Sequence, residues 1–186
     1  MKQLWVLMSV LLLAACGGDA GNCVRLSGGA KYCLVDGPAP QFETEQTATV
    51  TYAGNTMHML TRIRSGKDGL HFAGVTPLGQ TLIQVSWENN VLHAQLPPGA
   101  GDRLDGALFV ALLQLAVWPA ERVREGLSNR LTLIEQSGRR IISDGDRTLL
   151  TISWEGTTLP YDRLRFEAPA SHLLIDARVL NEADAS

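Results

Sequence analysis

The chain has 186 residues, of which 45% are hydrophobic and 19% are charged, and its net charge at pH 7 is −3. Because nucleic-acid-binding domains need a basic face, this balance argues against DNA or RNA as a partner. So apolar a composition needs either a large core or an apolar cavity.

The N-terminal region carries the pattern of a bacterial lipoprotein signal. Lys2 makes a basic tip, residues 4–13 form a short and mainly apolar run, and Leu-Ala-Ala precedes Cys16. Such a run is too short to span a bilayer comfortably. We therefore expect a signal peptide over residues 1–15 and lipidation of Cys16. The alternative is an ordinary cleaved signal in which Cys16 is incidental.

The region after the signal predicts a tethered domain. Residues 16–21 are expected to form the lipidated tether, and residues 22–186 a single domain. Gly17 and Gly18 occupy the positions at which retention signals for the inner membrane usually carry Asp. We therefore expect the protein on the periplasmic face of the outer membrane. The chain has no second apolar run of about 20 residues, so no further membrane span is expected.

Cys23 and Cys33 remain once Cys16 is assigned to the lipid. A three-residue hairpin loop at Ser27-Gly28-Gly29 would place the two cysteines directly opposite each other, close enough for a cross-strand disulfide. The alternative is two free thiols or a metal pair, for which the neighbouring sequence offers no third or fourth ligand. We favour the disulfide.

Most of the chain alternates apolar and polar residues, which is typical of antiparallel strands with one wet face. The apolar positions of the expected strands include Ala48, Val50, Tyr52, Met57, Met59, Ile63, Ile83, Val85, Trp87, Leu92, Ala94, Leu96, Leu150, Ile152, Trp154, Leu173, Ile175, Ala177 and Val179. Turn signals separate the strands at 54–55, 67–69, 89–90, 137–138, 144–145 and 155–156.

Residues 104–118 break the alternation and predict a helix. Its apolar residues lie around most of the circumference, so the helix should be buried. We expect Asp102 to be its N-cap. Pro119 then begins a second short helix over residues 120–125, which Gly126 closes.

A sheet of about 11 strands is too wide to stay flat and must curl or close. The sequence therefore predicts an α+β domain, in which helices cover the concave face of a curled antiparallel sheet that forms an open half-barrel. Beneath the helix lies either an apolar cavity or a solidly packed core. The residues expected to line a cavity are Trp87, Leu108, Leu112, Leu115, Ile152 and Trp154.

Known catalytic motifs do not occur in the sequence. It contains no Gly-x-Ser-x-Gly elbow, no phosphate-binding glycine loop and no His-Glu-x-x-His. The histidines, His58, His71, His93 and His172, lack the spacing of a metal site. We expect no enzymatic activity, no metal and no cofactor.

The turn Thr76-Pro77-Leu78-Gly79 is the most unusual local feature. Turn residues are normally exposed, so Leu78 is badly placed for a core. Exposed, this leucine would enter a bilayer or contact an acyl ligand; alternatively, it folds back and caps the mouth of the barrel. Pro77, Leu78 and Gly79 are therefore the candidate membrane- or ligand-engaging loop.

Two stretches of sequence resemble known families. Thr-Pro-Leu-Gly before the strand at 81–87 resembles the LolA/LolB superfamily of lipoprotein-sorting factors. There a similar Asn-Pro-Leu-Gly turn carries the outer-membrane receptor's protruding leucine, and Leu78 matches it. The stretch 113–120, Leu-Gln-Leu-Ala-Val-Trp-Pro-Ala, is more similar to a related family of uncharacterised bacterial lipoproteins, in which Pro-Leu-Gly, Leu-Gln-Leu-Ala-x-Trp-Pro and a Gly-Arg-Arg-like hairpin recur in this order. Its members are often encoded beside fatty-acid-synthase-like enzymes that make aryl polyene lipids.

These resemblances imply a curled sheet with helices over its concave side and a site for acyl chains. Thr76 replaces the receptor's Asn and the Cys23–Cys33 hairpin is additional, which favours handling of one lipid over general lipoprotein insertion. We therefore expect a lipoprotein that binds or transfers an acylated lipid or lipoprotein. The alternatives are a non-catalytic scaffold that docks an envelope partner through its sheet edge or helical lid, and an envelope hydrolase.

Overall fold

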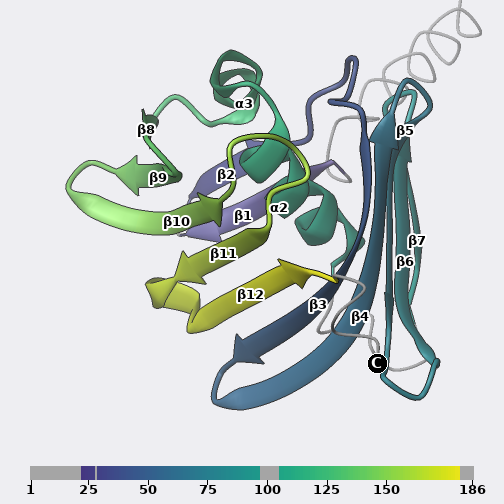
Figure 1. Cartoon of the computed structure of the whole chain (residues 1–186). Coiled ribbons are helices and arrows are strands. Elements are labelled where there is room, and N and C mark those ends of the chain that lie inside the picture. The colour runs from purple at the N-terminus through teal and green to yellow at the C-terminus, as the bar shows by residue number, and fades with distance from the viewer. Residues whose placement is uncertain (1–21, 28, 97–104, 181–186) are drawn as a thin grey trace, which may run out of the picture.

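A wide, curled antiparallel sheet dominates the computed structural model, which describes residues 22–27, 29–96 and 105–180 (Figure 1). Its ten strands are β3 (Phe42–Tyr52), β4 (Asn55–Gly66), β5 (Gly69–Val75), β6 (Thr81–Glu88), β7 (Val91–Gln95), β8 (Leu131–Gln136), β9 (Arg139–Asp144), β10 (Arg147–Glu155), β11 (Arg163–Ala168) and β12 (Leu173–Val179). Across the sheet they follow the order β7-β6-β5-β4-β3-β12-β11-β10-β9-β8. Among the described residues β7 and β8 each pair on one side only, so the sheet is open.

Pairing of β3 with β12 joins the two halves of the sheet. β3 pairs with β4 along its whole length, and its residues from Gln46 to Tyr52 pair with β12. In β3 buried and exposed residues alternate from Phe42 to Ala48, as the period-two pattern predicts. The predicted antiparallel strands are confirmed, although five strands follow the helices instead of about four.

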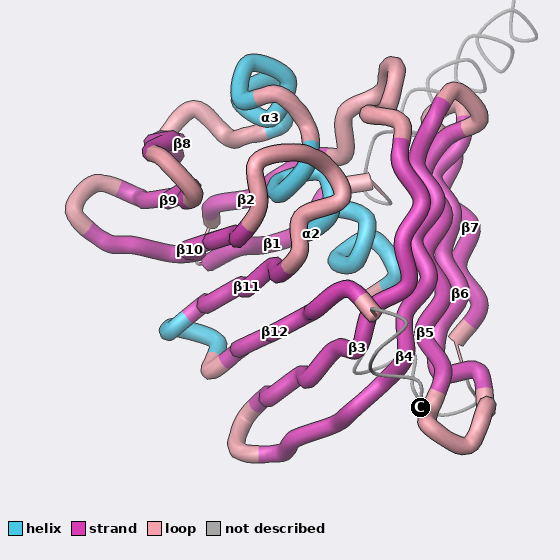
Figure 2. Tube along the Cα trace, viewed as in Figure 1, coloured by secondary structure: helices cyan, strands magenta, loops and turns pink. Residues whose placement is uncertain are grey.

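Two helices connect the halves of the sheet, and Figure 2 shows them on its concave side. α2 (Gly106–Val117) contacts β5, β6 and β7, and α3 (Ala120–Gly126) contacts β8. The expectation of a buried helix is confirmed, since ten of the twelve residues of α2 are buried. None of the helices in the described part of the chain is long and apolar enough to cross a membrane.

The predicted start of the first helix was wrong. Asp105, and not Asp102, is the N-cap of α2, because its Oδ1 accepts a hydrogen bond from the Ala107 N–H at 2.9 Å. Asp102 itself lies outside the described residues. Gly106 follows the cap and approaches β7 so closely that a Cβ there would lie 2.5 Å from the Cβ of Ala94. The close packing of helix on strand at this point requires glycine.

A hairpin of β1 (Cys23–Ser27) and β2 (Ala30–Cys33) forms a separate small sheet that packs on α2. Cys23 and Cys33 are direct partners in its register and are joined by a disulfide, as predicted. Ser27 belongs to β1 and not to the loop, because a register shift between Arg25 and Ser27 lengthens that strand.

The N-terminal end of the described chain lies beside the turn that joins β6 to β7. The Asn22 side chain donates a hydrogen bond to the Asn90 oxygen at 3.4 Å. The signal peptide predicted over residues 1–15, the lipidated Cys16 and the tether lie outside the described residues.

Candidate functional site

An apolar pocket lies on the concave face between α2 and the middle of the sheet. Its volume, counted as the space open to the centre of a water molecule, is about 50 Å³. Twelve of its fourteen lining residues are apolar or alanine, and none is charged. They are Gln46, Ala48, Val50, Met59, Thr61, Ile63, Phe72, Phe109, Leu112, Leu113, Leu164, Phe166, Ile175 and Ala177.

Small side chains at the centre of the sheet create this pocket. Ala48 pairs directly with Ala177 on one side and with Met59 on the other. These three residues form a small buried cluster apart from the main core, and the pocket is lined by members of both. At the helix side Phe109 is half-buried and stacks on Phe72, with ring centroids 5.3 Å apart. The alanines therefore leave room that larger side chains would fill.

One end of the pocket is polar. Gln46 and Thr61 face each other across β3 and β4 and are only 4% and 5% exposed. Thr44 and Ser65 follow on the same face and are 6% and 3% exposed. We call these four residues the polar quartet. Buried polar groups without partners destabilise a fold, and within the described residues the Thr44 and Ser65 hydroxyls have none, so this cluster requires an explanation.

Of the six residues expected to line a cavity, Leu112 lines this pocket. Trp87, Leu115 and Ile152 lie in the solid core, and the Trp87 indole donates a hydrogen bond to the Val35 oxygen at 3.2 Å. Leu108 and Trp154 are half-buried, and both pack against that core. Since large side chains fill space, a better sequence signal for the pocket was the small and polar residues at the inward positions of β3, Thr44, Gln46 and Ala48.

The Leu78 turn is rigidly built and fully exposed. Gly79 N donates to the Thr76 oxygen at 2.9 Å, and Thr76 N donates to the Gln80 oxygen at 2.8 Å. Thr76 Oγ1 accepts from Gln80 N at 3.1 Å, so threonine supplies the short polar acceptor that such turns use. Leu78 is 89% exposed. It does not fold back to cap the barrel.

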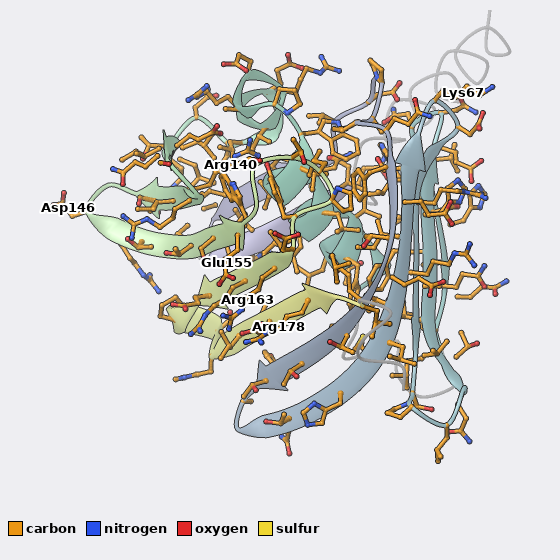
Figure 3. All side chains as sticks on the ribbon, viewed as in Figure 1. Lys67, Arg140, Asp146, Glu155, Arg163 and Arg178 are labelled. Atoms are coloured by element: carbon orange, nitrogen blue, oxygen red, sulfur yellow. A yellow bond between two sulfur atoms is a disulfide. The ribbon has the colours of Figure 1, made fainter. Side chains whose placement is uncertain are left out.

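The pocket and the Leu78 turn lie toward the same end of the sheet. Val75, the last residue of β5, pairs with Leu60, which is the neighbour of the pocket residue Met59. The turns at Lys67 and Asn90 lie at the opposite end, because β5 and β6 are antiparallel (Figure 3 labels Lys67). The Met59 side of the pocket therefore faces the end of the sheet that carries Leu78.

A buried arginine fixes the C-terminal end of α2 (Figure 3). The Nη1 of Arg140 donates to three backbone oxygens, those of Leu115 at 2.9 Å, Ala116 at 3.2 Å and Trp118 at 2.7 Å. Its Nε donates to Glu135 at 2.7 Å. A cation at this place satisfies the free carbonyls and complements the helix dipole.

Aromatic rings complete the surroundings of this guanidinium. It lies 5.7 Å from the centroid of the Trp154 ring, which stacks on Tyr161 at 5.2 Å. Burial raises the pKa of the Tyr161 phenol, and the charge of Arg140 opposes that shift. Arg140 is the second arginine of the Gly-Arg-Arg hairpin at residues 138–140, and the sequence pattern did not indicate that it supports the helix over the pocket.

Gln114 fixes the other side of the same helix. It is fully buried, and its Oε1 accepts from the Tyr32 hydroxyl and from Val35 N, both at 2.9 Å. Its Nε2 donates to the Val35 oxygen at 2.9 Å. Burial raises the pKa of the Tyr32 phenol, which keeps the hydroxyl available as a donor.

The convex face carries ion pairs. Arg163 donates to Asp176 and to Glu155, and Figure 3 shows Glu155, Arg163 and Arg178 close together on neighbouring strands. The hydrogen bond from Arg163 holds the pKa of Asp176 below its usual value. Within the described ranges, no three His, Cys, Asp or Glu side chains gather where they could hold a metal ion.

The sequence was compared with known proteins. No curated protein matches the chain. Residues 43–173 match the model of a family described as "Protein of unknown function (DUF3261)". The match begins in β3 and ends at the first residue of β12, so it includes the Leu78 turn, α2 and Arg140, while the disulfide hairpin precedes it. Because the match covers more than half of the chain, the protein belongs to the DUF3261 family.

Proposed function

We propose that the protein is an outer-membrane lipoprotein of the periplasm that binds an acyl chain of a lipid or lipoprotein in the concave pocket. The observation that carries the proposal is the uncharged, mainly apolar lining of that pocket. Moving apolar surface out of water is favourable by about 25 cal/mol per Å², so binding needs no catalytic group. Cys16 would hold the protein at the membrane.

The pocket wall is suited to enlargement on binding. Met59 lines it and Met57 packs behind it, and methionine adapts its shape more readily than branched side chains. Phe109 is half-buried at the helix side, so its ring can move without breaking the main core. The exposed Leu78 and its resemblance to the protruding leucine of the lipoprotein-sorting receptor also support the proposal.

Filling the pocket should abolish binding. Ala48→Phe should reduce the ligand-bound fraction at least tenfold, since the extra ring occupies the space between Ala177 and Met59. Native mass spectrometry of the full chain, exported with Cys16→Ser so that no lipid is attached, measures this fraction. Thr47→Phe, on the exposed face of the same strand, is the matched control.

Thermal melting monitored by circular dichroism must first show that Ala48→Phe still folds. If the variant is unstable, Ala48→Val is the milder filling change. The proposal would be refuted if native mass spectrometry found the parent protein without any bound ligand and the protein took up no acylated lipid when one was added.

Replacing Leu78 should slow delivery without changing stability. Leu78→Glu should leave the free energy of unfolding within about 0.5 kcal/mol of the parent, because the side chain contacts solvent. Transfer of a fluorescent acyl lipid to phosphatidylethanolamine–phosphatidylglycerol vesicles should slow about tenfold or more, given the roughly 1.5–3 kcal/mol gained on burying a leucine. Gln80→Glu adds the same charge two residues away as a control. Equal transfer rates for the parent and Leu78→Glu would remove the turn from the mechanism.

A non-catalytic scaffold is the second candidate function, and exposed apolar residues on the edge strands favour it. Val91 of β7 and Ile134 of β8 are 48% and 49% exposed. Within the described residues each of these strands leaves one edge unpaired, where a partner strand could add. Such a scaffold would bind no lipid. The substitution Ile134→Lys, which places a charge on the edge strand β8, would abolish binding of its envelope partner.

A further inference from the structure

We infer that the concave pocket selects a ligand with an apolar chain and an uncharged polar group, either a hydroxyl or an ester or amide carbonyl. A ligand with a free carboxylate would be rejected. This inference rests on the proposed function and names its ligand class. It is carried by Gln46 and Thr61, the two residues of the polar quartet that line the pocket.

Two residues of the quartet lie in an otherwise apolar pocket, and the other two lie beyond it on the same face of the sheet. Gln46 pairs directly with Thr61, and Thr44 and Ser65 follow on the same face of β3 and β4. Gln46 and Thr61 line the pocket itself. At its other end the pocket is lined by Val50 and Ile175, so in an enlarged pocket a chain would lie on apolar residues while its polar group reaches Gln46 and Thr61.

The hydrogen-bonding capacity of the quartet is largely unused. Thr44 Oγ1 and Ser65 Oγ have no partner among the described residues. Thr61 Oγ1 makes one long bond, 3.4 Å, to the backbone oxygen of Gln46. The Gln46 amide carries two donors and an acceptor, and none of the side-chain hydrogen bonds within the described residues uses it. Of these groups, the Gln46 amide and the Thr61 hydroxyl line the pocket and belong to side chains that are more than nine-tenths buried, so they are placed to bind a polar group of a ligand.

The absence of charged residues from the pocket lining determines which polar group of a ligand can bind there. None of the pocket-lining residues is charged, so a carboxylate would lose its hydration without gaining a cation. Arg62 and Arg64, which neighbour Thr61 and Ser65 in sequence, alternate to the exposed face of β4, where Arg62 pairs with Glu43. Arg163, next to the lining residue Leu164, pairs with Asp176 on the convex face. A hydroxyl or a carbonyl keeps its hydrogen bond through the Gln46 amide at no such cost.

A matched series of ligands tests the selection. Hexadecane, hexadecanol, methyl hexadecanoate and hexadecanoate share one chain length and differ only at the end group. Native mass spectrometry of the full chain with Cys16→Ser, offered equimolar pairs at neutral pH, gives the ratio of the bound forms. We expect hexadecanol and methyl hexadecanoate each to exceed hexadecanoate at least tenfold, and hexadecanol to exceed hexadecane.

Two variants on β3 separate the quartet from general effects. Gln46→Leu should bring the ratio of hexadecanol to hexadecane close to one while hexadecane still binds, because an apolar side chain of similar shape replaces the amide. Thr47→Leu, the outward-facing neighbour, should leave both ratios as they are. Thr61→Val provides a second test should Gln46→Leu fail to fold.

The outcomes distinguish the two proposals. Equal binding of hexadecanoate and hexadecanol, or ratios unchanged by Gln46→Leu, overturns the selection while the acyl-binding function stands. Binding of none of the four ligands overturns both.

Discussion

Arg140→Met should lower the free energy of unfolding by about 3–4 kcal/mol, because it leaves the buried carbonyls at the end of α2 without donors. For a protein of this size, that loss corresponds to a fall in Tm of about 10 °C. Methionine keeps most of the apolar stem of the side chain, so the loss of stability measures the contribution of the guanidinium group. Thermal and urea unfolding measure the change.

The neighbouring arginine provides the control for this variant. Arg139 is exposed and, among the described residues, its side chain donates only to Gln136, so Arg139→Met should stay within about 0.5 kcal/mol of the parent. Because α2 lines the pocket, we also expect Arg140→Met to weaken acyl binding. Similar stabilities for the two methionine variants would show that the buried charge does not hold the helix.

Gln114→Leu should cost about 3 kcal/mol of stability. It removes the acceptor of the Tyr32 hydroxyl and of the Val35 amide, which then stay buried without partners. The Val35 oxygen keeps its bond from Trp87, so the damage should be local to the segment after β2. Urea unfolding gives the total, and hydrogen exchange should show a much faster Val35 amide.

An exposed glutamine serves as the comparison. Gln84 lies on the outer face of β6, and Gln84→Leu should leave both stability and the Val35 exchange rate unaltered. An unchanged Val35 exchange rate in Gln114→Leu would mean that this hydrogen-bond network does not fix the segment to α2.

Local pattern was sufficient to predict the sheet, the buried helix and the disulfide. The alternation of apolar and polar residues identified the strands because one face of the sheet is buried and the other faces solvent. The Cys23–Cys33 pairing was predictable because a tight hairpin fixes which residues lie opposite each other. The N-cap of α2 could not be predicted in the same way, because Asp102 and Asp105 both lie near its expected start. The close approach of Gly106 to β7 decides in favour of Asp105.

Long-range packing made the pocket itself unpredictable. The sequence pointed to large residues as its lining, yet Leu115 and Ile152 fill the core while Ala48 and Ala177 leave the space. These alanines meet only because strands from opposite ends of the chain pair. The contacts of Gln114 likewise join residues 79 positions apart, which no local period reveals.

The position of Asn22 beside Asn90 determines how an acylated copy would stand at its membrane. The six steps along the chain from Cys16 to Asn22 span at most about 22 Å, whereas the eight residues of β6 separate the Asn90 end of the sheet from the Leu78 end by about 26 Å. If Cys16 carries the proposed lipid, a molecule with its strands upright on the leaflet would hold Leu78 away from that leaflet. A molecule tilted onto its side would bring the anchor and Leu78 to the same lipid surface.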